Sequence, residues 1–211
     1  MKMDKTIILD EEYGQLWQHY VTRMEDTIEK ALVAHPRTLA LRVDLHLPEY
    51  NDLLCANTDS QVITRFMASL RSQLMAQWHR KSQPGGRIHW TDLRYVWARE
   101  FDWFGIKPHY HVVLLLNNDA YNAPGNYQSE GTNLATIIIA AWYRALRIAI
   151  PAHPKDRSLV KFVKNPCYWI DANSDSVEEV LSELMFRMRY MAKVRSKHHE
   201  DGYRLFGCSQ G

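Results

Sequence analysis

The spacing of apolar residues divides the chain into helical and extended segments. Four segments carry apolar residues along one helical face and are bounded by residue types that start or stop helices. The expected helices cover residues 11–34, 60–81, 133–148 and 175–197. Pro36 follows the first helix, and Ser174 is placed to cap the last one.

Other segments have the period of two that is typical of strands, or are rich in aromatic and β-branched residues. The expected strands cover residues 38–47, 87–102, 109–117, 159–163 and 167–171. Residues 103–108 are expected to form a hairpin connection between the second and third strands. This order predicts an α+β fold, with a mostly antiparallel central sheet of about five strands and helices covering one face. We expect residues 1–36 to form an N-terminal helical extension and residues 37–211 to form one domain.

Composition narrows the classes of protein that need to be considered. The 211 residues are 46% hydrophobic and 24% charged, which is ordinary for a soluble globular protein. A net charge of +2 neither demands nor excludes nucleic acid as a partner. The three cysteines have no metal-site or disulfide spacing, and no apolar run is long enough to span a bilayer. We therefore expect a cytoplasmic protein with no membrane partner and no signal peptide.

The segment with the most chemical information holds two histidines at the start of an apolar strand. His109 and His111 are two positions apart, so in a strand their side chains point to the same face. Two imidazoles arranged in this way form half of a site for a divalent metal. The pattern alone is weak, because with 10 histidines in 211 residues chance gives roughly half of one such pair per chain.

A metal site needs a third ligand, and the preceding strand offers a carboxylate. Across the expected hairpin, Glu100 falls near the level of the two histidines. Asp102 has the same parity and is the alternative, and His46 on the first strand is a further candidate. The identity of the third ligand is open at this stage, because Glu100 is also consistent with a solvated charge on an open sheet face.

The expected last helix carries a tyrosine and a lysine away from its apolar face. Tyr190 lies roughly 130° from the centre of the apolar stripe, counting about 100° per residue, and Lys193 is three positions further on the same side. A nearby ammonium would favour the phenolate that a tyrosine nucleophile needs. The same residues are also consistent with an ordinary basic helix surface.

Basic residues are concentrated at the end of this helix, where the helix dipole favours them. They are Arg187, Arg189, Lys193, Arg195 and Lys197. Such a surface also suits phosphate groups, and tryptophans can provide stacking platforms for bases. The tryptophans considered for that role are Trp90, Trp97, Trp103 and Trp169, although most are expected to be core or rim residues.

Together, the His109–Tyr110–His111 strand and the Tyr190–Met191–Ala192–Lys193 helix segment resemble the motifs of the HUH superfamily of single-strand DNA endonucleases. The likeness is greatest to the replication initiators of filamentous phages (inoviruses) and their prophage relatives. The segment from Ile106 to His111 and the tail from Phe206 to Ser209 contribute to it. The resemblance covers roughly residues 38–209 and implies an HUH/RRM-like sheet.

The resemblance implies a rolling-circle replication initiator that nicks and rejoins single-stranded DNA through a 5′-phosphotyrosine intermediate. It implies Tyr190 and Lys193 as catalytic residues, and Mg²⁺ or Mn²⁺ held by His109, His111 and Glu100. The DNA contacts would be Arg187, Arg189, Arg195 and Lys197. Phe186 stands where some members have a second tyrosine, which favours a single-tyrosine enzyme.

The implied partners are single-stranded or hairpin origin DNA, a separate helicase and the host replication machinery. Two other functions are open: a prophage-encoded DNA-binding protein without nicking activity, including a retired relic, and a metal-dependent phosphodiesterase that uses water. If Tyr190 were not the nucleophile, Tyr110 and Tyr143 would be the next candidates.

Overall fold

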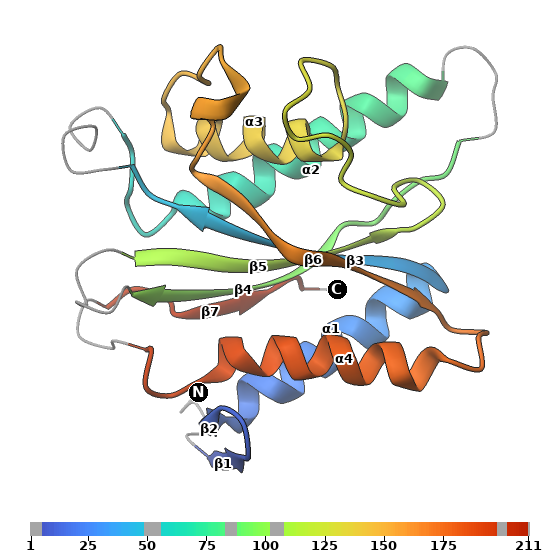
Figure 1. Cartoon of the computed structure of the whole chain (residues 1–211), viewed down its shortest axis with the longest axis vertical. Helices are drawn as coiled ribbons and strands as arrows, with labels where there is room; N and C mark the ends of the chain where they lie inside the picture. Colours follow the sequence, from blue (N-terminus) through green and yellow to red (C-terminus); the bar gives the residue numbers. More distant parts are fainter. Residues whose placement is uncertain (1–5, 49–55, 83–87, 102–107, 198–201, 211) are drawn as a thin grey trace.

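The computed structural model describes residues 6–48, 56–82, 88–101, 108–197 and 202–210. Five antiparallel strands form the central sheet in the order β6-β3-β5-β4-β7, which confirms the expected α+β class (Figure 1). The strands are β3 (Arg37–His46), β4 (Arg94–Phe101), β5 (Pro108–Asn117), β6 (Val160–Asp171) and β7 (Phe206–Cys208).

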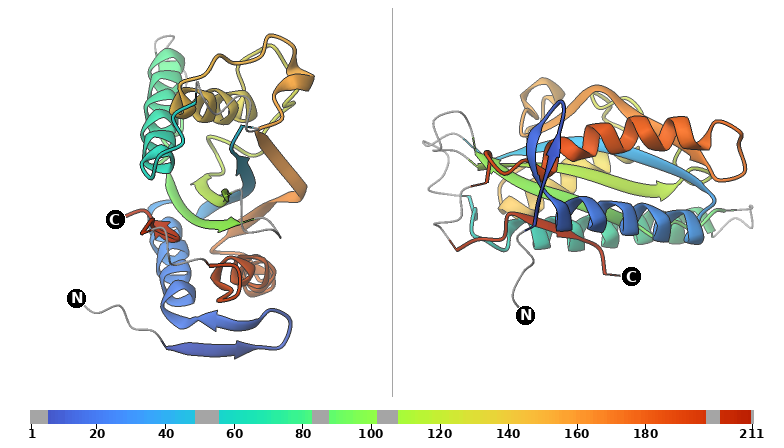
Figure 2. Two further views of the ribbon diagram at one scale, coloured as in Figure 1. Left: turned by 90° about the vertical axis from the view of Figure 1, so that its left-hand side faces the viewer. Right: turned by 90° about the horizontal axis from the view of Figure 1, so that it is seen from below.

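Helices cover both faces of this sheet, so the prediction of a single covered face was wrong. The helices are α1 (Gln18–Ala34), α2 (Val62–Ser82), α3 (Leu134–Leu146) and α4 (Val177–Arg189), with short 3₁₀ turns η2 (Pro154–Asp156) and η3 (Tyr190–Ala192). The helices α2 and α3 lie on one face, while α1 and α4 lie side by side on the other (Figure 2). The physical reason lies in the central strand, where every residue from Tyr110 to Leu116 is buried and both faces are therefore apolar. No helix within the described ranges has the length and apolar character needed to cross a membrane.

The N-terminal segment begins with a hairpin, where a continuous helix was expected from residue 11. Strand β1 (Ile7–Asp10) pairs with β2 (Gly14–Trp17), and α1 starts only after them. The carboxylate of Asp10 accepts hydrogen bonds from the backbone N–H groups of Glu12 and Tyr13, and Gly14 takes a positive φ of 73°. These local turn features outweigh the helical spacing. The helix itself packs on the sheet through residues such as Met24 and Ile28.

The last helix is shorter than its apolar pattern predicts. It ends at Arg189, and the chain continues through η3 into an extended segment, although a helix to residue 197 was expected. A bridge between Leu16 and Lys193 and a 2.9 Å hydrogen bond from the N–H of Val194 to the Gln15 carbonyl pair this segment with β2. Tertiary pairing with the hairpin therefore ends the helix.

The edges of the sheet also differ from the expectation. The two short strands expected around Asn165 form the single edge strand β6, in which Asn165 takes a positive φ of 51° at an irregularity. The second expected strand, 87–102, forms β4, which begins only at Arg94. Strand β7, near the C-terminus, pairs with β4. Most of the expected hairpin at 103–108 lies outside the described residues.

Candidate metal centre and tyrosine

Three neighbouring strands bring the candidate metal ligands to one end of the sheet. In the β4–β5 pairing, Glu100 lies opposite His109, and in the β3–β5 pairing His46 lies opposite His109 and Asp44 opposite His111. His111 shares its sheet face with Val113 and Leu115, which pack in the same core as residues of α1 and α4. The site therefore lies at the edge of that core, next to the end of α4.

The ligand atoms of Glu100, His109 and His111 converge on one point, and all lie within 4.8 Å of one another. The two histidine Nε2 atoms are 3.2 Å apart, and His111 Nε2 is 3.5 Å from Glu100 Oε2. A cation with ligands at about 2.1 Å separates neighbouring ligand atoms by about 3.0 Å at right angles and about 3.4 Å at tetrahedral angles. Two imidazoles and one carboxylate at this spacing fit a divalent cation and leave coordination positions open.

Asp44 and Arg42 support the site from the neighbouring strand β3. Asp44 Oδ1 is 2.6 Å from His111 Nδ1, so the Nδ1–H donates to the carboxylate and Nε2 is the atom that a metal would bind after loss of its proton. This carboxylate–histidine contact is the arrangement that orients histidines in metal sites. The Arg42 guanidinium lies 3.6 Å from the same carboxylate oxygen and balances its charge.

Two lysines hold the buried carboxylate of Glu100, which is only 2% exposed. Lys197 Nζ is 2.9 Å from Oε1, and Lys193 Nζ is 3.8 Å from Oε2. Burial alone would favour the neutral acid, but His111 and Lys197 outweigh burial and hold the pKa of Glu100 far below its ordinary value. Glu100 is therefore a carboxylate at neutral pH, with Oε1 occupied by lysine and Oε2 directed at the histidines.

The two histidines differ in charge preference. Burial, followed by the charges of His111 and His46, lowers the pKa of His109 to about 4, so His109 is neutral near pH 7. Burial acts in the same direction on His111, but its hydrogen bonds to Asp44 and Glu100 outweigh burial and raise its pKa above the ordinary value. A metal would therefore have to displace a proton from His111 but not from His109.

Tyr190 lies beside the histidines, in the turn that follows α4. Its ring meets the His111 ring edge to face, with 5.4 Å between the centroids, and Lys193 Nζ lies 3.1 Å from the centroid of the tyrosine ring. The expected neighbours are therefore together, but Tyr190 is half-buried and not presented outward. Burial, followed by the Glu100 charge, raises the pKa of Tyr190, although the nearby Arg42 and Arg195 act to lower it.

The predicted DNA-contact residues have different environments. Lys197 is buried against Glu100, because the chain leaves the helix before reaching it, so its expected place on an exposed basic helix surface was wrong. Arg187 donates to backbone carbonyls of β6, and Arg189 lies 3.6 Å from Asp10 Oδ2. Arg195 is exposed.

The alternative ligands and nucleophiles are placed as follows. The His46 ring stacks on His109 at 5.6 Å but does not belong to the group of three converging ligands. Asp102 lies outside the described residues. Tyr110 and Tyr143 are buried in the core on the opposite face of the sheet, so neither can reach the histidines. Trp97 is buried, Trp90 and Trp169 are exposed, and Trp103 is outside the described residues.

Sequence reasoning missed two residues of the site, Arg42 and Tyr13, and assigned a third, Lys197, a different role. Arg42 lies on β3 and its guanidinium carbon is 5.6 Å from the Tyr190 ring centroid. Tyr13 comes from the unexpected hairpin and meets the Tyr190 ring edge to face, with 5.8 Å between centroids. The alternation of Arg42, Asp44 and His46 on one face of β3 was the available signal for Arg42; no local pattern indicated Tyr13.

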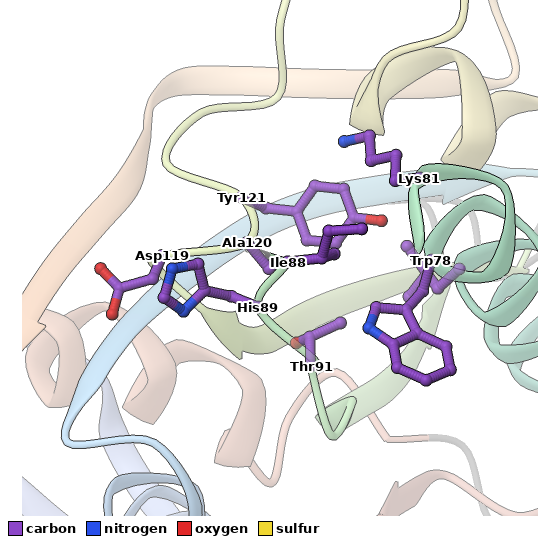
Figure 3. Close-up of a pocket in the computed structure, with 9 residues that line it drawn as sticks. Trp78, Lys81, Ile88, His89, Thr91, Asp119, Ala120 and Tyr121 are labelled. Atoms are coloured by element: carbon purple, nitrogen blue, oxygen red, sulfur yellow. The ribbon is translucent and has the colours of Figure 1, made fainter. Parts of the chain in front are cut away.

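A separate pocket lies on the other face of the sheet, between α2, the segment that precedes β4 and the segment that follows β5 (Figure 3). Its lining includes Trp78, Lys81, His89 and Tyr121. The Tyr121 hydroxyl donates a 2.5 Å hydrogen bond to Gln77, and Lys81 Nζ is 5.8 Å from the Tyr121 ring centroid. None of the pocket's lining residues belongs to the candidate metal centre.

Comparison with known proteins identifies relatives along nearly the whole chain. The family model of the YagK/YfjJ C-terminal domain matches residues 1–209. Escherichia coli (strain K12) YfjJ is 38% identical over 212 residues, which cover 96% of this chain and 99% of YfjJ. YagK of the same strain is 41% identical over 181 residues, which cover 83% of this chain and 85% of YagK. Both relatives are described as uncharacterized proteins, and no solved structure matches the chain.

Proposed function

We propose that this chain, which belongs to the YagK/YfjJ C-terminal domain family, nicks and rejoins single-stranded DNA through a covalent bond to Tyr190. This is the activity implied by the resemblance to HUH replication initiators. The observation that carries the proposal is the convergence of Glu100, His109 and His111 with the Tyr190 ring 5.4 Å from that of His111. Antiparallel pairing of β4 and β5 brings Glu100 to the two histidines, but Tyr190 is about 80 residues away in the sequence, so local pairing does not explain its position beside them.

The charges of the site support an anionic substrate. Arg42, Lys193 and Lys197 stand against the carboxylates of Asp44 and Glu100, and a divalent cation would add to the positive charge. The negative charge of a phosphodiester bound here would balance this excess of positive charge. When bound by His109, His111 and Glu100, Mg²⁺ or Mn²⁺ would supply Lewis-acid stabilisation of the charge that develops on the scissile phosphate.

The chain's own residues account for the chemical step. The Tyr190 oxygen forms a bond to phosphorus as the bond from phosphorus to the 3′ oxygen breaks, leaving a 5′-phosphotyrosine and a free 3′-OH after protonation. Burial, as the largest effect, lowers the pKa of Lys193 to about 8, so a minority of this amine is neutral near pH 7 and able to take the phenol proton. Attack by a 3′-OH on the phosphotyrosine reverses the step and rejoins the strand.

The substrate class follows from the position of the site. The scissile phosphate has to reach ligands at the end of a sheet beside a half-buried tyrosine, and a single strand or an extruded hairpin can bend to do so. We expect strand separation to come from a separate helicase, and synthesis from the free 3′-OH to come from host replication machinery. In this reading the protein initiates rolling-circle replication.

A covalent-adduct assay tests the proposal. Labelled single-stranded DNA fragments tiled across the region that flanks the gene are incubated with the protein and Mn²⁺, then separated on a denaturing protein gel. We expect a shifted, labelled band that disappears in EDTA and in Tyr190→Phe. Tyr13→Phe is the matched control, because it removes a hydroxyl one ring away and should retain the adduct within about threefold.

The other outcomes identify the alternatives. An adduct that persists in Tyr190→Phe would assign the nucleophile elsewhere, with Tyr13 as the first candidate. Cleavage without an adduct in both variants would indicate a metal-dependent phosphodiesterase that uses water. DNA binding that survives EDTA, with no cleavage of any fragment, would indicate a binding protein without nicking activity.

A further inference from the structure

Two adjoining hollows lie where α4 meets the edge strand β6. The first is lined by Tyr13, Tyr168, Ser182, Glu183, Phe186 and Arg187. The second continues along β6 past Pro166, Cys167 and Trp169. Tyr168, Glu183 and Arg187 line both hollows, so the two form one continuous groove.

Aromatic rings follow this groove from the candidate site outward. Tyr13 contacts Tyr190 edge to face at 5.8 Å and Phe186 at 5.3 Å between ring centroids, so the groove begins one ring away from Tyr190. Phe186 is 50% exposed in this groove, whereas the indole of Trp169 at its far end donates a 2.7 Å hydrogen bond to the Asn122 carbonyl on the other side of the sheet. An exposed phenylalanine ring in a hollow that is also lined by the half-buried rings of Tyr13 and Tyr168 marks a candidate binding site.

Arg187 joins the two walls of the groove. Its Nη1 donates to the carbonyl of Asn165 at 2.9 Å and to the Tyr168 hydroxyl at 3.1 Å, and its Nη2 donates to the carbonyl of Lys164 at 2.9 Å. The guanidinium is therefore fixed in place by β6 and is available as a flat cationic surface. Glu183 lines both hollows and offsets this charge. The near-neutral, aromatic lining suits the faces of bases better than a row of phosphates.

We propose that this groove binds the unpaired bases of single-stranded DNA next to the scissile phosphate, with Phe186 as the principal stacking platform. The choice of occupant rests on the proposed function, because a strand attached at Tyr190 has to continue past the adjacent rings. Stacking on aromatic side chains is tolerant of sequence, so the groove holds the strand while other contacts select the origin.

The test measures binding without chemistry. Tyr190→Phe protein in EDTA is titrated with fluorescein-labelled oligo(dT), and fluorescence anisotropy reports the affinity. Adding Phe186→Ala should weaken binding about tenfold or more, as expected for loss of one stacked base. Phe186→Trp should retain binding, with quenching of the new tryptophan. Tyr127→Ala is the matched control: its side chain is 51% exposed and stacks on Phe162 away from the groove, so the affinity should not change.

The results separate this inference from the proposed function. Equal affinity of Phe186→Ala and its parent, or equal binding of a duplex of the same length, would overturn the groove assignment even if the covalent adduct forms. Weakened binding in Phe186→Ala with no adduct in any assay would support the groove and overturn the nicking activity. The folding of each variant is checked by its melting temperature.

Discussion

His111 links the metal position to the rest of the protein. Its Nε2 faces Glu100 and His109, while its Nδ1 contacts Asp44 at 2.6 Å. Asp44 and Glu100 both orient the ring and stabilise its protonated form. A proton on His111 therefore competes with a metal ion for Nε2. The chemistry of this one residue therefore sets the pH range in which a metal can bind.

Metal affinity should fall as the pH is lowered. The pKa of His111 is raised above its ordinary value of 6.5, so on acidification from pH 8 the ring takes up the competing proton already before pH 6.5. His109, with its pKa lowered to about 4, remains neutral between pH 8 and pH 6 and does not contribute to the pH dependence of metal affinity. Calorimetric titration with Mn²⁺ between pH 8 and pH 6 should show a steady loss of affinity together with proton release on binding.

The variant Asp44→Asn provides the check on this assignment. Loss of the carboxylate removes an interaction that raises the pKa of His111, so the affinity loss should move to lower pH. Affinity at pH 8 should also fall about 10- to 100-fold, as for other residues that orient a ligand. A pH dependence identical to that of the unaltered chain would contradict the role given to Asp44.

Lys197 should stabilise the metal-free protein through Glu100. Lys197→Met leaves a buried carboxylate without its 2.9 Å partner, which should cost about 3–5 kcal/mol of unfolding free energy. Mn²⁺ should stabilise this variant more than the unaltered chain, because the ion replaces the missing positive charge. Urea denaturation with and without Mn²⁺ measures both effects. The exposed Lys155→Met is the control, and equal stabilisation by Mn²⁺ in all three proteins would contradict the pairing.

At the scale of elements, local patterns predicted most helices and strands but not how they end. The capping box of Asn133 and Thr136 agrees with the expected start of α3. In contrast, residues 11–17 and 193–197 have helical spacing, yet neither segment is helical, and Gln15 and Leu16 pair with Lys193 and Val194. Their structure depends on contacts between the two ends of the chain, which periodicity within one segment does not register.

The C-terminal strand β7 depends on a glycine at its centre. A Cβ at residue 207 would lie 2.6 Å from Cε2 of the buried Trp97, so Gly207→Ala forces the indole or β7 to move. We expect a loss of about 1–3 kcal/mol in unfolding free energy. Gly131→Ala is the control, because the added carbon would approach only the Ser129 hydroxyl, and it should change stability by less than about 0.5 kcal/mol. A loss no larger than the control's would contradict the described packing of β7.

At the scale of the molecule, the candidate site is a product of strand order. The spacing of His109 and His111 was visible in the sequence because a strand places them on one face, and Glu100 followed from antiparallel pairing across a short connection. Lys197 and Tyr13 were not predictable in their observed roles, because these depend on where α4 ends and on the hairpin that pairs beyond it. Sequence reasoning therefore brought the three candidate ligands together and missed much of what surrounds them.

The candidate site lies at one end of the central strand β5, where it has a neighbouring strand on each side. Strand β5 lies between β3 and β4, so the two histidines have a neighbour on each side that supplies a carboxylate, Asp44 or Glu100. The helix pair α1 and α4 covers one face of the sheet (Figure 1), and the turn after α4 brings Tyr190 to within 5.4 Å of the His111 ring. Strand order, pairing register and helix termination together determine the arrangement that we interpret as a nuclease site.

Mass spectrometry of the protein after reaction with single-stranded DNA and Mn²⁺ tests the central claim most directly. Digestion after Arg189 and Lys193 isolates the peptide Tyr190–Lys193. We expect this peptide to carry a nucleotide through a phosphodiester bond to Tyr190, and EDTA to prevent the modification. Cleaved DNA with no modified peptide, or a nucleotide on a different residue, would contradict it.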